Sequence, residues 1–178
     1  MVNFLTEFLP LRVVFLSMTP RQLGDLIDRL GPALVLYARQ WAAAPEDVVQ
    51  DAFLRLVEAR RVPDDPPAWL FAVVRNRAMD LAKTDRRRAK REQAARPARW
   101  FVEPEIDGLD AHQAVAALDR LPAEMRETIV ARLWGGLTFE QIAAVGGCSA
   151  SSAFRRYEAG IAALKESLGA PCPTDPTP

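Results

Sequence analysis

The sequence predicts an all-α protein of two small helical domains joined by a flexible linker. Apolar residues recur at three- and four-residue intervals, helix caps recur between them, and strand-like alternation beside hairpin turns is missing. A chain of 178 residues that is 49% hydrophobic has room for two small cores. The predicted divisions are an N-terminal extension over 1–18, a first domain over 19–93, a linker over 94–109, a second domain over 110–169, and a disordered tail over 170–178.

Helix boundary signals divide the first domain into three helices. Thr19 and Gln22 have capping-box spacing around Pro20, and Asp65 stands before Pro66-Pro67, where it can cap a later helix. The residues between the last two helices, Arg60–Asp65, read as a loop. The expected helices run over Thr19–Ala43 with Gly31-Pro32 as a kink or break, from Pro45 to about Ala59, and from Pro66 through Arg91.

The second domain carries the order and spacing of a helix-turn-helix. Thr138 and Gln141 have capping-box spacing, Gly146-Gly147 supplies a turn, and Ser149 can cap a final helix. The second helix of such a motif lies in the DNA major groove. Two apolar stripes should pack its helices together, one formed by Leu118, Leu121, Met125, Ile129 and Leu133, and the other by Ala153, Tyr157, Ile161, Leu164 and Leu168.

The start of the final helix is the first predicted DNA-binding segment. Hydroxyl and arginine side chains there can contact phosphates or base edges. A plain three-helix bundle with a solvated arginine pair is the alternative interpretation. The predicted contact residues are Ser149, Ser151, Ser152, Arg155 and Arg156.

Positive charge is concentrated in one block of an otherwise neutral chain. The protein has 23 basic and 23 acidic residues, yet residues 75–99 carry 10 basic and 3 acidic ones. Such a block favours a localised anionic partner, because neutralising phosphates releases counterions, although a solvated helix end would look similar. The predicted nucleic-acid contacts in the block are Arg75, Asn76, Arg77, Lys83, Arg86, Arg87 and Arg88.

The helix that starts at Pro45 has a mixed polar and apolar face. Asp47, Gln50, Asp51 and Leu54 share one face, whereas a purely structural helix needs only an apolar stripe on the other. This pattern suits docking on a partner protein.

Several classes of protein are disfavoured by composition. The two cysteines, Cys148 and Cys172, have neither zinc nor disulfide spacing, and His112 is the single histidine, so neither a metal site nor a cofactor is expected. No nucleophile, base or phosphate loop assembles, so we expect neither an enzyme nor a small-molecule substrate. Residues 1–16 are too short and interrupted to span a membrane, and we interpret Met18 as the natural start. The cysteine usage fits a reducing cytoplasm.

Three segments in order resemble bacterial sigma factors of the extracytoplasmic-function (ECF) type. They read PEDVVQDAFLRL, AWLFAVVRNRAMDLAKTDRRR and LPAEMRETIVARLWGGLTFEQIAAVGGCSASSAFRRYEAGIAALKE. The likeness covers about residues 22–168. Three motifs with the right order and spacing are far more specific than any one of them.

The resemblance implies that the chain is a promoter-specificity subunit of RNA polymerase. Its first domain would place the basic block near the minus-ten element and help open the DNA. Its second domain would place Ser149–Arg156 in the major groove of the minus-thirty-five element, with the linker threading through the polymerase. The implied partners are core RNA polymerase and promoter DNA, and an anti-sigma factor is compatible with the family. The implied polymerase-binding residues are Asp47, Val48, Gln50, Asp51, Phe53 and Leu54.

The sequence also departs from the family pattern. Phe154 stands where the family has a lysine-like residue in the recognition helix, and Gly146 and Cys148 replace larger apolar residues near the turn. Arg60–Ala68 is short and rich in proline where the family carries the loop that binds a flipped minus-ten base. Two alternatives stay open: a stand-alone helix-turn-helix regulator that binds duplex DNA without polymerase, and an interaction protein that has lost promoter reading.

Overall fold

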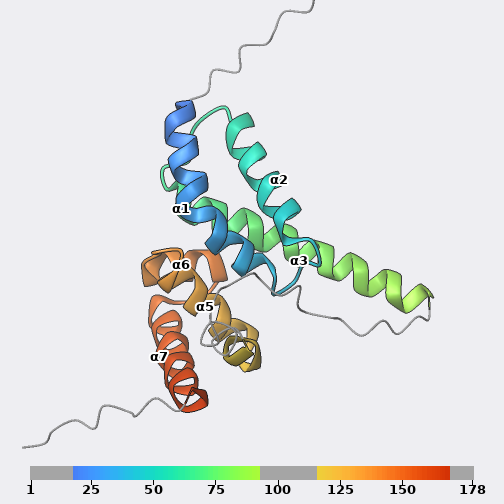
Figure 1. Ribbon diagram of the computed structural model, residues 1–178, viewed down its shortest axis with the longest axis vertical. Helices are drawn as coiled ribbons and strands as arrows, with labels where there is room; N and C mark the ends of the chain where they lie inside the picture. The colour runs from blue at the N-terminus through green and yellow to red at the C-terminus, as the bar shows by residue number, and fades with distance from the viewer. Residues whose placement is uncertain (1–17, 93–115, 169–178) are drawn as a thin grey trace, which may run out of the picture.

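The computed structural model describes residues 18–92 and 116–168, and every regular element in those ranges is an α-helix (Figure 1). Residues 1–17, the predicted linker 94–109 and the predicted tail 170–178 lie outside the described residues. Residues 116–120 form one further short helix. The named helices are α1 (Pro20–Ala38), α2 (Pro45–Glu58), α3 (Pro66–Glu92), α5 (Ala123–Leu133), α6 (Phe139–Gly146) and α7 (Ala150–Ser167).

The helix starts in the first domain follow the predicted caps. The Thr19 hydroxyl accepts from the Gln22 backbone N–H at 3.2 Å, while the Gln22 side chain accepts from the Thr19 N–H at 2.9 Å. At the start of α3, the Asp65 carboxylate accepts from the Ala68 N–H at 3.1 Å. Both predicted caps are confirmed. They could be predicted from the sequence because each joins residues only three positions apart.

The structure differs from the prediction for α1. Of the predicted kink or break at Gly31-Pro32, the break is wrong, because the helix continues through Pro32, and the helix ends at Ala38 instead of Ala43. Proline removes one backbone donor, but the helix buries a long apolar face on both sides of it, which includes Leu30 and Leu34. Beyond Ala38 the chain turns, and the Trp41 N–H donates to the Ala38 carbonyl at 3.0 Å.

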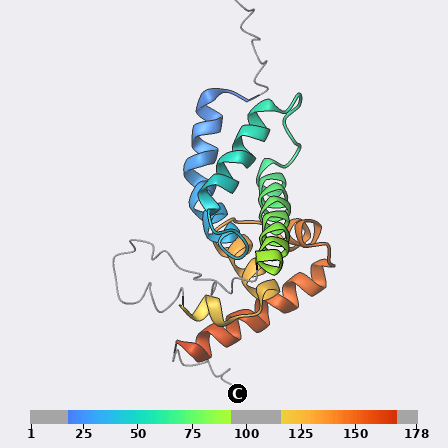
Figure 2. The same ribbon diagram turned by 90° about the vertical axis from the view of Figure 1, so that its right-hand side faces the viewer.

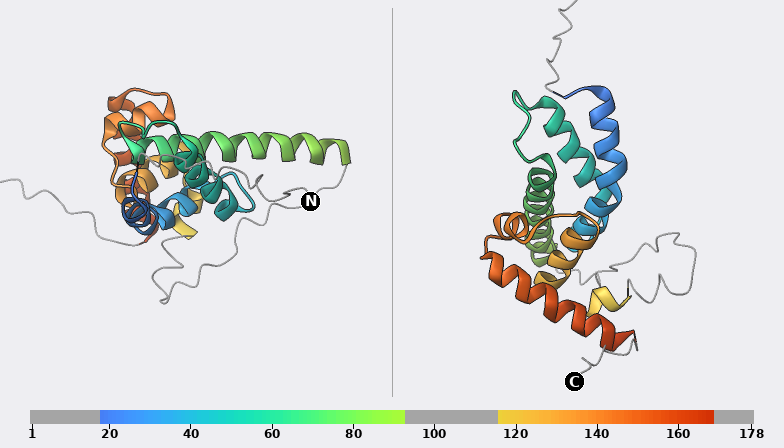
Figure 3. Two further views of the ribbon diagram at one scale, coloured as in Figure 1. Left: turned by 90° about the horizontal axis from the view of Figure 1, so that it is seen from above. Right: turned by 90° about the vertical axis from the view of Figure 1, so that its left-hand side faces the viewer.

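The first three helices share one apolar core. Helices α1 and α2 lie side by side and α3 crosses beneath them (Figures 1 and 2). The rings of Tyr37 and Phe71 meet edge to face, with centroids 4.9 Å apart and an interplanar angle of 70°. The second half of α3, which carries the basic block, projects away from this core (Figure 3).

Helices α5, α6 and α7 form the second unit. Buried Leu118, Leu121 and Ile129 pack against partly buried residues of α7, as the stripes predicted. Leu133 and Leu168 are exceptions, with exposed fractions of 53% and 45%. Pro122 is the N-cap of α5 and separates it from residues 116–120, so the first stripe is divided between two helices. Leu133 is the last residue of α5, and Leu168 follows the last residue of α7.

The two units pack directly against each other. The main hydrophobic core contains residues of α1, α2 and α3 together with Val130, Leu137, Ile142 and Ala153 from the second unit. The two units come close together at Gly135, where a Cβ atom would lie 2.5 Å from Cζ of Phe71 and 2.6 Å from the carbonyl oxygen of Ala131. Only a residue without a side chain allows α3 and the end of α5 to approach this closely.

We therefore predict that Gly135→Ala destabilises the protein by about 1–3 kcal/mol, because the added methyl group overpacks the contact. Gly24→Ala is the matched control, since its Cβ would meet nothing within 4 Å inside α1. That change should instead stabilise the helix by roughly 0.5–1 kcal/mol. Urea unfolding of the two variants checks both expectations. Equal stabilities for the two variants would contradict the close approach.

Candidate nucleic-acid interface

The projecting half of α3 presents a row of basic and polar side chains to solvent. Asn76, Arg77, Lys83 and Arg86 are exposed. Arg87 and Arg88 lie in the last turns of α3, and their side chains are outside the described part of the chain. This half of the helix projects away from the core of the first domain (Figure 3), and basic side chains clustered on it suit a phosphate backbone.

Two residues of this row already have acidic neighbours. Lys83 Nζ lies 3.2 Å from Asp80 Oδ1, one turn away on the same helix. Arg77 Nε lies 3.5 Å from Asp51 Oδ2 of α2, and Arg55 lies 3.3 Å from the same carboxylate oxygen. Such exposed pairs contribute little to stability and exchange readily for phosphate contacts. The structure thus brings together Asp51, predicted to bind polymerase, and Arg77, predicted to bind DNA.

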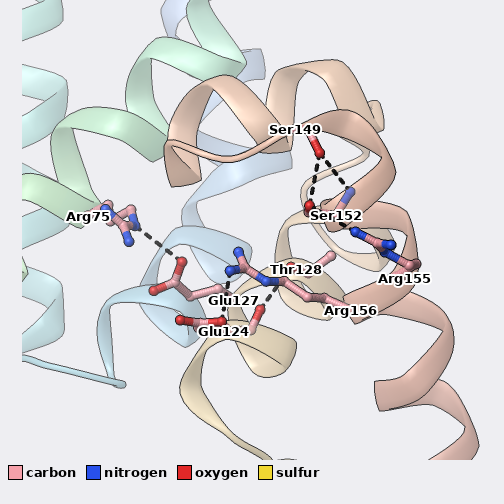
Figure 4. A network of polar contacts seen from close by, with 8 residues as sticks. All are labelled: Arg75, Glu124, Glu127, Thr128, Ser149, Ser152, Arg155 and Arg156. Atoms are coloured by element: carbon pink, nitrogen blue, oxygen red, sulfur yellow. Dashed lines mark hydrogen bonds and ion pairs between the residues drawn. The ribbon is translucent and has the colours of Figure 1, made fainter.

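Arg75 occupies a different environment from the rest of the block. Its Nε lies 3.1 Å from Oε2 of Glu127 on α5, and the two side chains are 21% and 13% exposed (Figure 4). Burial raises the pKa of the Glu127 carboxyl above its ordinary value of 4.5, and the positive charges of Arg75 and Arg156 offset only part of that effect. Arg75, which was predicted to contact DNA, therefore pairs in this arrangement with a carboxylate of the other domain.

The helix-turn-helix has the geometry that its sequence predicted. Thr138 caps α6 by a capping box with Gln141, and Gly147 ends α6 in the left-handed conformation with φ of 66°. Ser149 caps α7, and its hydroxyl accepts from the Ser152 N–H at 3.1 Å. These local contacts fix the angle at which α7 leaves the turn.

The five predicted contact residues of α7 differ in their availability. Ser149, Ser151 and Arg155 are exposed, and the Arg155 guanidinium lies 3.4 Å from the Ser152 hydroxyl (Figure 4). Arg156 instead pairs with Glu124 of α5, with 2.8 Å between Nη2 and Oε2. Helix α5 thus supplies one carboxylate to an arginine of each predicted DNA-binding segment.

The predicted polymerase-binding residues of α2 divide between two faces. Asp47, Gln50 and Leu54 are exposed and Asp51 is half-buried. Val48 and Phe53 are 1% and 8% exposed and belong to the main core. Their prediction as surface contacts needs correction, because helical periodicity turns both side chains inward, where they support the helix from beneath.

Sequence reasoning missed the side chains that link the two domains. Besides Glu127, these are Asp65 of the short Arg60–Ala68 loop and Gln141 of α6, which form a hydrogen bond between the Gln141 amide and the Asp65 carboxylate. The partners are 52 and 76 residues apart in the chain. No spacing rule reaches that far, and a glutamate on α5 has no sequence feature that distinguishes it from a solvated one.

Within residues 18–92 and 116–168, no three histidine, cysteine, aspartate or glutamate side chains gather where they could hold a metal ion. None of the helices described there is both long and apolar enough to cross a membrane.

The chain matches known proteins over both domains. Residues 26–89 match the family Sigma-70 region 2, and residues 111–164 match the family Sigma-70, region 4. The chain is 31% identical over 155 residues to the RNA polymerase sigma factor CarQ of Myxococcus xanthus, which covers 82% of this chain and 88% of CarQ. A second relative, the ECF RNA polymerase sigma factor SigL of Mycobacterium tuberculosis, is 31% identical over 134 residues, which are 71% of this chain and 76% of SigL. The chain therefore belongs to the Sigma-70 family of RNA polymerase sigma factors, of the ECF type.

Other relatives agree with this membership. The ECF RNA polymerase sigma factor EcfG of Rhodopseudomonas palustris is 30% identical over 112 residues, which are 58% of this chain and 60% of EcfG. SigJ of Mycobacterium tuberculosis is 28% identical over 162 residues, covering 83% of this chain and 46% of SigJ. The chain thus spans less than two thirds of the length of these two relatives. Among solved structures, the sigma factor RpoE from Bartonella quintana, in complex with the anti-sigma factor NepR, has a TM-score of 0.63 and 25% identity, with 84% of this chain and 97% of RpoE covered.

The raised pKa of Glu127 predicts the pH dependence of stability. The folded protein holds a proton on Glu127 more tightly than the unfolded chain does. Protonated Glu127 therefore contributes stability that is full below the ordinary pKa of 4.5 and is lost as the pH rises through the higher pKa of the folded state. The free energy of unfolding of the wild type, relative to Glu127→Gln, should therefore fall as the pH rises above about 4.5. Urea unfolding of both proteins across this range measures the difference. An increase with pH would mean that the Arg75 pair outweighs burial.

Proposed function

We propose that this sigma factor directs RNA polymerase to its promoters, with α2 binding the polymerase, α3 binding the minus-ten region and α7 binding the minus-thirty-five element. The observation that carries the proposal is the presence, in one chain, of both family regions, each with an exposed basic segment at the expected place. A stand-alone regulator would have no use for the first region, so that alternative is not favoured.

The action of the protein is binding without catalysis. The polymerase performs the chemistry, and this chain supplies contacts that hold the duplex and the separated strand. Transcription takes place where polymerase and genome meet, so the protein acts in the cytoplasm. The fold shared with RpoE, which was solved with the anti-sigma factor NepR, supports an anti-sigma partner for this chain as well.

The closed arrangement of the two domains must open for this function. The names of the two promoter elements place them about 25 base pairs apart, which is about 85 Å along a duplex at about 3.4 Å per pair. Arg75 lies 3.1 Å from Glu127 of the second domain, and the longest helix of that domain has 18 residues, about 27 Å. Both DNA-binding segments therefore lie within a few tens of ångströms of each other when closed, which is too close to reach both elements.

The chain has the length needed for opening. The 23 residues of 93–115, which connect the two described ranges, can span at most roughly 80 Å when fully extended. Separation of the domains would free Arg75 from Glu127 and make its guanidinium available to a phosphate. We propose that polymerase, by binding α2 and the second domain at separate places, supplies the free energy for this exchange.

Polymerase binding through α2 is tested by Leu54→Lys. Leu54 is 52% exposed, and burial of a leucine side chain is worth about 1.5–3 kcal/mol, so its loss should weaken binding to core polymerase roughly tenfold or more. Ile27→Lys is the matched control, because Ile27 is 41% exposed on the neighbouring helix α1. Affinity is measured by titrating labelled sigma factor with core polymerase, and run-off transcription is measured in parallel.

The proposal expects the wild type and Ile27→Lys to bind core polymerase and to support promoter-dependent transcripts, while Leu54→Lys loses both. If the wild type shifts duplex DNA unaided and gives no polymerase-dependent transcript, the proposal is wrong. If Leu54→Lys and Ile27→Lys weaken polymerase binding equally, α2 is not the helix that docks on the polymerase.

A further inference from the structure

A large aromatic side chain stands on the outer face of the recognition helix. Phe154 is 43% exposed, although it lies one turn into α7, among the residues predicted to face DNA. Its neighbour Arg155 and the earlier Ser151 are exposed on the same part of the helix. The family pattern has a lysine-like residue here. Phenylalanine carries neither a charge nor a hydrogen-bonding group, so Phe154 can contribute only an apolar contact at this position.

The Phe154 ring is held in a fixed orientation. It meets the ring of Phe139, the first residue of α6, edge to face, with centroids 5.3 Å apart and an interplanar angle of 88°. Phe139 also meets Tyr157 at 5.6 Å and 64°. The Arg132 guanidinium also supports the Phe139 ring, with 4.9 Å between Cζ of Arg132 and the ring centroid. Nη1 of Arg132 donates to the Leu137 carbonyl at 2.8 Å, which holds the guanidinium in place. An exposed aromatic residue with this support is preorganised for contact with a partner.

The surroundings of Phe154 indicate that this partner is DNA. Arg155 and Ser151 are exposed beside Phe154 on α7, and Arg132 lies over the Phe139 ring that Phe154 contacts. Guanidinium and hydroxyl groups of this kind suit phosphates and sugars. The core of a protein–protein interface is apolar and depleted of charged residues. Phe154 instead has an arginine as its direct neighbour, which fits a protein interface poorly. Glu140 of α6 and Glu158 of α7, which lie close to Phe139 and Phe154 in sequence, are also exposed. The surface around Phe154 is therefore not uniformly positive.

In the major groove, phenylalanine has one preferred target. Each base pair presents hydrogen-bond donors and acceptors there, and the only apolar group among them is the C5-methyl of thymine. Phe154 carries no donor or acceptor, so opposite any other base edge it would leave polar atoms unpaired. We infer that Phe154 is a specificity-determining residue that reads the methyl group of a thymine in the upstream promoter element. This inference rests on the proposed function, and it specifies the base that this chain selects at one position.

The test is a transcription selection with reconstituted holoenzyme on promoters whose upstream element is randomised. Wild type should select thymine at one position of that element. Replacing that thymine by deoxyuridine, which lacks only the methyl group, should lower run-off transcription about fourfold, the value expected for one methyl group removed from water. With Phe154→Ala, the preference at that position should disappear, and deoxyuridine should cause no further loss.

Three further variants separate possible causes. Phe154→Leu should keep a preference for thymine, because it preserves an apolar contact. Arg155→Ala should lower transcription on all selected promoters alike, as expected for a phosphate contact. Leu168→Ala is the matched control, since Leu168 is 45% exposed where α7 ends, and its selection should equal that of wild type.

The outcomes are distinguishable. If wild type gives no polymerase-dependent transcript on any promoter, the proposed function fails and the inference fails with it. If transcripts appear but deoxyuridine has no effect, or Phe154→Ala selects the same base, only the inference is overturned. If Phe154→Ala binds core polymerase more weakly and loses transcription equally on every promoter, Phe154 contacts protein and does not read thymine.

Discussion

The buried contact between Arg75 and Glu127 is the interaction that links the packing of the two domains to the proposed function. It joins the helix that carries the basic block to the helix that begins the second domain, at the place where Phe71 packs against Gly135. Both charged side chains are largely buried, so removing either one would leave the other without a partner in a poorly solvated site. The same pair occupies one of the arginines expected to bind the promoter. Packing and function therefore compete for one guanidinium group.

The distribution of acids explains how a neutral chain can bind nucleic acid. Carboxylates of α5 pair with one arginine from each DNA-binding segment, while Asp51 and Asp80 lie beside exposed members of the basic block. In the closed state these acids satisfy the arginines internally and weaken attraction to DNA outside a promoter complex. In the proposed open state, in which polymerase holds the domains apart, the buried pair between domains would be broken and Arg75 would be available to the promoter. Affinity for the promoter then comes from the assembled complex more than from the isolated chain.

How much the sequence predicted depends on how far apart the interacting residues lie. The caps at Thr19, Thr138 and Ser149 were predictable because each bond spans three residues. The three helices of the first domain, α6, α7 and the exposed face of α2 followed from caps and periodicity, whereas the stripe from Leu118 to Leu133 is divided at Pro122 between residues 116–120 and α5. The inward orientation of Val48 and Phe53 follows from the same periodicity, whereas the resemblance implies the six polymerase-binding residues only as a group. The bonds of Arg75 with Glu127 and of Asp65 with Gln141 depend on how the domains dock, which no local pattern encodes.

The distance between the two domains, measured in free protein and in the polymerase complex, tests this account most directly. Spin labels at Asp28→Cys on α1 and Glu166→Cys on α7, in a variant with Cys148 and Cys172 changed to serine, occupy exposed sites in separate domains. We expect a single short distance in the free protein and a distance longer by tens of ångströms in the complex with core polymerase and promoter DNA. An unchanged distance in a transcriptionally active complex would contradict it, because the closed domains would then be the functional form.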